Sequence, residues 1–335
     1  MAYLALRNPQ YKWITIPSSG VLSTTCTITI NGTLAYTLNK NVTASTTIHF
    51  EIAELSRDFL SIAYDGSYNA QSIDIVVSLQ NYSGSNGTGS AVGSPSNSTD
   101  KGIEAYGTFT EAVSPQLPFS NRQLPTWLIA GEPTGITDIF EIFIPENTSG
   151  YINHMNAAET IIRSNYSATD TQITGSGLPT LNITRIPCTK YGTGTRVVFL
   201  NKFGVQQDLF FFLKDVKNLS RTSTSYNSNT LVSPYDERPY YSQQDAATKV
   251  FNTQAKQTHS LSSGFYPEFA VEYFEQLLLS EYVWMVIPAR EHTGSDFIPV
   301  TVKSSKMVIK KSVNDRLIEY TIEFEDAFNY INNIR

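Results

Sequence analysis

The chain has 335 residues, enough for two domains, and a net charge of −6 from 24 basic and 30 acidic side chains. The basic residues are scattered without a cluster, which argues against nucleic acid or an anionic membrane as a direct partner. The opening residues lack a signal-peptide pattern, and no apolar run approaches the ~20 residues that span a bilayer. We therefore expect a soluble protein that is made in a cytoplasm.

The composition favours sheets over helices. Charged residues are only 16% of the chain, while Ser, Thr and Asn are abundant beside 19 Tyr and 18 Phe. We predict a mainly β protein of antiparallel sandwich or barrel domains, the first over 1–115 and a larger one over 116–335. Cys26 and Cys188 have no metal-ligand spacing, and we interpret them as small buried side chains.

In the first eighty residues, apolar and polar side chains alternate on both sides of a turn at 31–33. A strict two-residue turn would misalign the two apolar rows, so we predict a three-residue loop with a bulge. A further inward row is predicted over 73–79, with a short helical turn ahead of it. The predicted pairs are Cys26 with Leu38, Ile28 with Tyr36 and Ile30 with Leu34.

Two long polar stretches interrupt these patterns. Residues 81–102, NYSGSNGTGSAVGSPSNSTDKG, have the composition of a flexible loop or linker. The GTGSAVG within them misses the dinucleotide-binding pattern, so we expect no phosphate site there. The Tyr-rich stretch 220–257 shows no periodicity, and a loop of that length usually wraps a neighbour or closes a site.

The segment RVVFLNKFGVQQDLFFFLKDVK, 196–217, predicts two strands around a turn bracketed by Asn201 and Gly204. The second strand ends in LFFFL, which is apolar on both faces, although one apolar face suffices to join a core. Two covers for the second face remain open. One is the amphipathic helix predicted over 267–279 from its apolar stripe, and the other is a neighbouring subunit.

The closing stretch KMVIKKSVNDRLIEYTIEFE, 306–325, predicts a hairpin with a two-residue turn at Asn314 and Asp315. In that register apolar residues pair on one side and opposite charges pair on the other, so two patterns agree. The predicted pairs are Ile309 with Tyr320, Met307 with Ile322, Lys310 with Glu319 and Lys306 with Glu323.

The sequence gives no support for catalysis. It contains no G-x-S-x-G, Walker A or H-E-x-x-H motif. Glu291, His292 and Asp296 lie close together, but a metal site needs a rigid surrounding shell and none is indicated. We therefore expect no enzyme, no cofactor and no metal.

Three segments resemble structural proteins of tailed bacteriophages: TRVVFLNKFGVQQDLFFFLKD, EQLLLSEYVWM and VNDRLIEYTIEFEDAFNYINNIR. The resemblance is to virion proteins of crAss-like and related phages of Bacteroidota, and it covers mainly 185–335. It implies a virion component without fixing its position, and it supplies no catalytic residues. The predicted architecture is also similar to tail-tube and tail-hub folds, in which neighbouring subunits join into a ring.

The resulting hypothesis is a tail or neck protein of a phage virion, made in the host bacterial cytoplasm. It would form a ring of its own copies, dock to other tail or neck proteins, and clasp a neighbour with 220–257. The alternative is a fibre or adhesin that binds host-surface glycan, which would show exposed aromatic residues near carboxylates and amides. The residues expected at the interface are Phe203, Phe210, Phe211, Phe212, Tyr235, Tyr240 and Tyr241.

Overall fold

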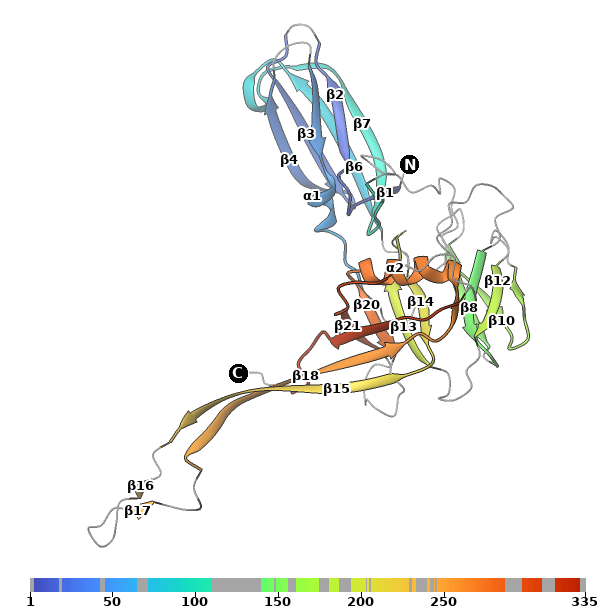
Figure 1. Ribbon diagram of the computed structural model, residues 1–335. Coiled ribbons are helices and arrows are strands. Elements are labelled where there is room, and N and C mark those ends of the chain that lie inside the picture. Colours follow the sequence, from blue (N-terminus) through green and yellow to red (C-terminus); the bar gives the residue numbers. More distant parts are fainter. Residues whose placement is uncertain are drawn as a thin grey trace.

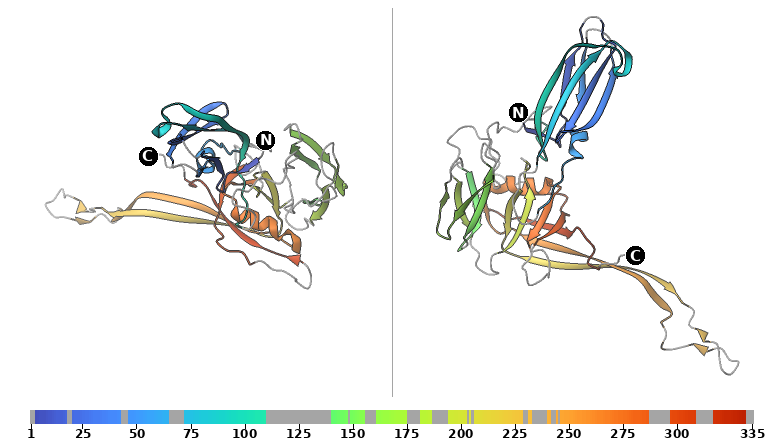
Figure 2. Two further views of the ribbon diagram at one scale, coloured as in Figure 1. Left: turned by 90° about the horizontal axis from the view of Figure 1, so that it is seen from above. Right: turned by 180° about the vertical axis from the view of Figure 1, so that it is seen from behind.

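The computed structural model describes residues 3–17, 20–42, 46–64, 72–109, 140–147, 149–155, 161–174, 181–186, 194–202, 204, 206–228, 231–232, 240–241, 244, 246–286, 297–308 and 317–331. Within these ranges the chain is mainly β, as predicted. An N-terminal unit stands on a C-terminal body, a small group of strands lies beside the body, and a long two-stranded arm projects from it (Figure 1). The two further views in Figure 2 show the same projecting arm.

The N-terminal unit contains a five-stranded sheet, order β1-β7-β6-β3-β4, and a two-stranded sheet of β2 and β5. Both sheets contribute to one core, in which Ile28, Ile75 and Phe50 are buried. The predicted inward row 73–79 is confirmed, and the predicted helical turn is α1 (Ala53–Arg57). The strands are β1 (Tyr3–Ala5), β2 (Tyr11–Thr15), β3 (Ser23–Ile30), β4 (Thr33–Asn41), β5 (Thr47–Glu51), β6 (Ser72–Tyr82) and β7 (Ala91–Ile103).

The β3–β4 hairpin turns through two residues, so the prediction of a three-residue loop is wrong. Asn31 and Gly32 have φ of 49° and 80°, the positive values that a type I′ turn requires at both positions. The predicted bulge is present and shifts the register, so Ile28 still pairs with Tyr36. Cys26 pairs with Leu38 as predicted, whereas Ile30 pairs with Thr33 and not with Leu34.

Residues 81–102 form regular structure, so the prediction of a flexible loop is wrong. β6 ends at Tyr82, the 3-10 turn η1 (Ser85–Gly87) follows, and β7 returns along β6. A β-ladder is held by backbone groups, so small polar side chains are tolerated wherever the strand faces solvent. The composition of the segment therefore gave no sign of the pairing. The predicted domain boundary at 115 lies outside the described residues.

The C-terminal body is a seven-stranded sheet with the order β14-β13-β20-β21-β23-β18-β15. The 3-10 turn η2 (Glu268–Ala270) and the helix α2 (Val271–Leu279) lie across one face of this sheet (Figure 1), close to the predicted helix over 267–279. None of the described helices is long and apolar enough to cross a membrane. The strands are β13 (Thr195–Leu200), β14 (Gln206–Phe211), β15 (Asp215–Asn227), β18 (Thr248–Ser262), β20 (Val283–Val286), β21 (Phe297–Val302) and β23 (Thr321–Asp326).

Smaller sheets complete the described chain. A three-stranded sheet and a two-stranded sheet lie beside the body, and two short strands pair near the far end of the arm (Figure 1). The strands are β8 (Phe140–Pro145), β9 (Gly150–Met155), β10 (Ile161–Tyr166), β11 (Gln172–Ile173), β12 (Leu181–Ile186), β16 (Leu231–Val232), β17 (Tyr240–Tyr241), β19 (Tyr266–Pro267) and β22 (Leu317–Ile318).

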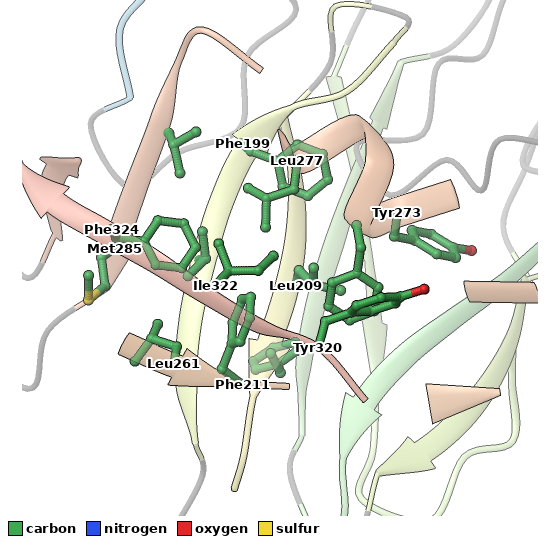
Figure 3. Close-up of a cluster of buried hydrophobic side chains, with 14 of the residues drawn as sticks. Phe199, Leu209, Phe211, Leu261, Tyr273, Leu277, Met285, Tyr320, Ile322 and Phe324 are labelled. Carbon is green, nitrogen blue, oxygen red and sulfur yellow. The ribbon is translucent and has the colours of Figure 1, made fainter. Parts of the chain in front are cut away.

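The first four residues of the LFFFL segment, 209–212, are buried within one chain, whereas Leu213 is exposed. The ring of Phe211, labelled in Figure 3, meets the ring of Phe274 of α2 edge-on, with 6.2 Å between the ring centroids. Phe212 packs against Tyr266 at 5.7 Å, and the hydroxyl of Tyr266 donates to the carbonyl oxygen of Phe210 at 2.6 Å. Of the two covers that the sequence left open, the helix therefore covers Phe211, and Tyr266 of β19 covers Phe212.

The closing hairpin predicted over 306–325 is wrong in register. β23 pairs with β18 and β21, so Ile322 faces Leu261 instead of Met307. Charges still pair on this sheet, but between distant segments: Glu325 binds Lys256 at 2.8 Å and Lys303 at 3.1 Å. Lys306 and Met307 lie in no strand, while Ile309, Lys310, Asn314 and Asp315 are outside the described residues.

Candidate functional site

Three of the residues predicted at an interface are core residues. Phe210, Phe211 and Phe212 are 9%, 3% and 9% exposed, and all three belong to the main core cluster of the body. So little exposed surface leaves almost nothing to bury against another subunit. These side chains therefore pack inside the body, and their burial argues against the interface role that was also predicted for them.

The other predicted interface residues concern the arm. Tyr240 and Tyr241 form β17, which pairs with β16 near the far end of the arm (Figure 1). Phe203 and Tyr235 lie outside the described residues. The structure thus brings the predicted tyrosine pair together on the arm and keeps it away from the phenylalanines of the body.

The arm itself occupies the segment predicted as a long loop, 220–257, and most of that segment is strand. β15 is 13 residues long and β18 is 15, and they pair as an antiparallel ribbon with one bulge. Only the root of the ribbon joins the body, because β23 pairs with β18 from Thr258 to Ser262. The secondary structure was missed because Ser, Thr and Asn on both faces of an exposed ribbon leave no apolar alternation to read.

The projecting part of the arm is open to another chain. Nearly all of β15 is exposed, and in the described part of the chain no strand pairs with its outer edge. An isolated two-stranded ribbon is marginally stable in water, and an open edge is a template for pairing. Lys217 and Arg221 lie on this edge strand, and such charges oppose indiscriminate pairing. The arm therefore suits a specific partner.

Apolar side chains gather on the outer part of the ribbon. Tyr226, Val250 and Phe251 are each about half exposed, at 49%, 50% and 47%. The rings of Tyr226 and Phe251 are in contact across the two strands, with centroids 6.1 Å apart. We call these three residues the distal cluster. Exposed aromatic rings in contact on an otherwise polar arm are typical of a contact surface.

A buried polar cluster at the root of the arm was missed in the sequence. His259 of β18 is 1% exposed, with its Nε2 at 3.2 Å from Oδ1 of Asp326 and its Nδ1 at 4.0 Å from Oδ1 of Asp215. Its Nε2 also contacts the side-chain nitrogen of Gln257 at 3.0 Å. These residues come from three strands, so the cluster connects both strands of the arm to β23. The available signal was the position of His259 two residues before the buried Leu261.

A second buried pair lies on the outer strands of the body. Nη2 of Arg196 on β13 is 2.9 Å from Oδ2 of Asp208 on β14, and the Asp208 side chain is almost fully buried. Burial raises the pKa of Asp208 from 3.8 to about 6, because desolvation outweighs the attraction of Arg196. This carboxyl is thus protonated far more readily than an exposed aspartate.

Charged residues also join the N-terminal unit to the body. Arg57 of α1 contacts Glu104, which follows β7, and its Nη2 lies 2.6 Å from Oε2 of Glu281, which follows α2. Nη2 of Arg7 lies 3.2 Å from the other oxygen of Glu281. The hydrogen bonds that Arg57 donates to the carboxylate of Glu104 raise the pKa of Arg57, so its charge is fixed. Four side chains thus link two units that are distant in sequence.

The residues considered for a metal, Glu291, His292 and Asp296, lie outside the described residues. Among the residues that are described, no group of three or more His, Cys, Asp or Glu side chains is arranged to hold a metal ion. Comparison with protein-family models, curated proteins and solved structures finds no match to this chain. The arm, its distal cluster and its buried root are therefore the features from which a function is argued.

Proposed function

We propose that this chain is a structural component of a phage virion, a tail or neck protein that acts by self-assembly and by docking to partner proteins. The observation that carries the proposal is the arm, an exposed β ribbon with an open edge and an apolar distal cluster. A ribbon of this kind gains its stability from what it contacts, because alone it buries little surface. An assembling subunit supplies that contact.

The resemblance to virion proteins of tailed phages supports the same proposal. The segments that carry it contain β13, β14, part of α2, β20 and β23, and each of these contributes side chains to the core of the body. The analogy with tail-tube and hub folds is drawn from a helix-covered sheet with a projecting hairpin, and from two N-terminal sheets that contribute to one core. Function does not follow from a fold alone, so the arm remains the deciding feature.

The proposed partners are copies of the same chain in a closed ring and other proteins of the tail or neck. A contact between two different surfaces of identical subunits closes into a ring when the rotation between subunits allows it. The low content of charged residues, 16%, favours close packing in such an assembly. The proposed location is the virion tail, after synthesis in the host bacterial cytoplasm.

Peptide mass spectrometry of purified particles tests the proposal, using a phage that encodes this chain. We expect its peptides in gradient-purified virions at a fixed ratio to a known tail protein, because a ring has a fixed number of copies. Matched fractions from cells without the phage serve as the control. Finding the chain only in the host lysate, never in particles, would contradict a structural role.

A second candidate function has one observation in its favour. Tyr11 and Trp13 lie on the outer face of β2, 37% and 62% exposed, opposite Glu51 and His49 of β5. Exposed rings beside a carboxylate form the kind of surface on which a glycan-binding adhesin would hold its ligand. Binding to a glycan array that is lost in Trp13→Ala, and kept in Leu34→Ala on the neighbouring sheet, would favour this function.

A further inference from the structure

A short segment of the N-terminal unit crosses onto the body. Residues 60–64, which we call the strap, follow α1 and run down to the body beside β20 (Figure 1). Leu60, at the start of the strap, packs against the core of the N-terminal unit. Ile62 and Tyr64 pack instead in a cluster of the body that contains Trp284. The strap thus joins the interiors of the two units.

The strap lies on the sheet face opposite to α2. Val198 of β13 belongs to the cluster under the strap, whereas Val197 and Phe199 on either side of it belong to the core under α2. Tyr64 is only 7% exposed, and its ring contacts that of Trp284 with 5.5 Å between centroids. The end of the strap is therefore packed into the body and does not merely rest on its surface.

Polar contacts join the strap to the buried pair of Arg196 and Asp208. Arg196 donates a hydrogen bond to the hydroxyl of Tyr64, and its Nη2 lies 2.9 Å from Oδ2 of Asp208. Gln206, which is buried on β14, donates through Nε2 to the carbonyl oxygen of Ala63 at 3.1 Å. Asp208 comes two residues after Gln206, so both side chains lie on the same face of β14. The strap therefore covers the patch of sheet in which Asp208 is buried.

Among the described residues of this patch, Asp208 is the group that changes charge near neutral pH. Its pKa is about 6, because burial outweighs the attraction of Arg196. Burial, and then the charge of Asp208, raise the pKa of Tyr166 on β10 to about 12, so Tyr166 stays neutral. Tyr64 is also neutral in this range, while Arg196 and the Arg185 that lies beside Tyr166 stay charged. A change of pH thus acts on this patch through one carboxyl.

We infer that the strap is a pH-sensitive latch, which holds the N-terminal unit on the body while Asp208 is neutral and loosens when this carboxyl ionises. With the strap closed, the Asp208 side chain is only 1% exposed, and burial disfavours its charged form. An open strap lets water reach the carboxylate, so ionisation favours opening. Opening uncovers Val198 and Trp284 and leaves the contacts around Arg57 in place. The inference goes beyond the proposed function and does not depend on it.

Two neighbouring positions on β13 allow the opening of the strap to be measured. Val198→Cys places a thiol under the strap, and Val197→Cys places one under α2, and both valines are fully buried. The rate at which a dipyridyl disulfide labels each thiol, divided by its rate with a free thiol at the same pH, gives the opening constant at that position. Peptide mass spectrometry locates the label. Opening of the strap exposes the first position, whereas the second is exposed only when the body opens.

The latch predicts that the opening constant at position 198 rises with pH. Asp208 has a pKa of about 6 under the closed strap and approaches its ordinary value of 3.8 when the strap is open. Opening should therefore increase by up to roughly 100-fold between about pH 4 and about pH 7, and then level off. Adding Asp208→Asn to the Val198→Cys protein should remove this rise, because the side chain no longer titrates.

A variant of the strap tests the same link from the other side. Tyr64→Ala should hold the strap open, so that labelling at position 198 is fast at every pH although Asp208 is unchanged. The matched control is Phe59→Ala, which removes an exposed ring next to the strap that contacts Tyr36 of the N-terminal unit. The control should keep the slow labelling at low pH and its rise. Thermal unfolding shows that each variant is folded.

Three results would overturn the latch. One is an opening constant at position 198 that does not change with pH, or that changes equally in the presence of Asp208→Asn. Another is equal labelling at positions 197 and 198 at every pH, because the strap would then open only together with the body. The third is a folded Tyr64→Ala protein that keeps the pH-dependent rise, which would show that other elements bury Asp208. None of these results bears on the proposed assembly of the chain.

Discussion

Asp208 is a carboxyl whose burial makes its charged form costly in the folded protein. Its pKa is raised from 3.8 to about 6 by burial, even though Arg196 lies 2.9 Å away. Between these two values the folded protein holds a proton that the unfolded chain has released, so stability falls as the pH rises. The contribution is fully present below about pH 4 and is lost as the pH passes about 6.

We therefore expect the free energy of unfolding to fall by up to ~3 kcal/mol between about pH 4 and about pH 6 through this group. Asp208→Asn should flatten that part of the profile, because the side chain no longer titrates. Urea denaturation at a series of pH values measures the effect, with the exposed Asp74→Asn as a control that keeps the fall. An unchanged profile in Asp208→Asn would show that another group causes it.

The turn position or burial of a single residue was predicted correctly only where the residues next to it in the sequence formed a recognisable pattern. Asn201 and Gly204 were expected to bracket a turn, and the N–H of Gly204 donates to the carbonyl oxygen of Asn201 at 3.0 Å. Cys26 was expected to be buried, and burial raises the pKa of its thiol to about 11. His259 was missed, because its neighbours Asp215 and Asp326 come from strands that no local pattern pairs with it.

At the scale of elements, the sequence predicted correctly the strands and helices that a single segment specifies. It failed to predict which distant segments pair. The inward row of β6 and the buried stripe of α2 follow from periods of two and 3.6, which a single segment displays. The partners of β23 are β18 and β21, and the first of these lies far upstream. The closing hairpin was predicted from two patterns that agreed. In the structure β23 instead pairs within the larger sheet, where its side chains face residues of β18 and β21.

Arg57 lies at the contact between the N-terminal unit and the body. There α1 meets the residues that follow β7 and α2. Arg57→Ala removes the links to Glu104 and Glu281 and leaves Glu104, which is buried, with only a weak contact to Arg7 at 4.0 Å. We expect a loss of about 1–3 kcal/mol in the coupling between the two units, since a buried carboxylate loses its main partner. Calorimetry should then show two unfolding transitions that lie farther apart than in the wild type.

The control for this variant is Lys101→Ala. Lys101 pairs with Asp74 at 3.6 Å inside the N-terminal unit, so its loss removes an ion pair without touching the junction. Equal separation of the transitions in both variants would mean that the charges at the junction do not couple the units.

At the scale of the whole molecule, the arm distinguishes this chain from a self-contained globular protein. The body and the N-terminal unit each have their own apolar core, whereas the described residues of the outer arm belong to none. We predicted from the sequence that 220–257 clasps a neighbour, but nothing in the sequence pointed to the ribbon or to its distal cluster. Both depend on the pairing of β15 with β18, and strands with polar residues on both faces show no apolar alternation in the sequence.

The most direct test of this account is the mass in solution of the wild type and of a variant with a shortened arm. Ser220 pairs with Lys256, so replacing residues 221–255 by Asn-Gly closes the ribbon with a tight turn and keeps the pairing of 215–220 with 256–261. We expect the wild type to be a closed oligomer and the shortened protein to be a folded monomer with the unfolding behaviour of the body. A wild type that is monomeric, or a shortened protein with the same mass as the intact oligomer, would contradict assembly through the arm.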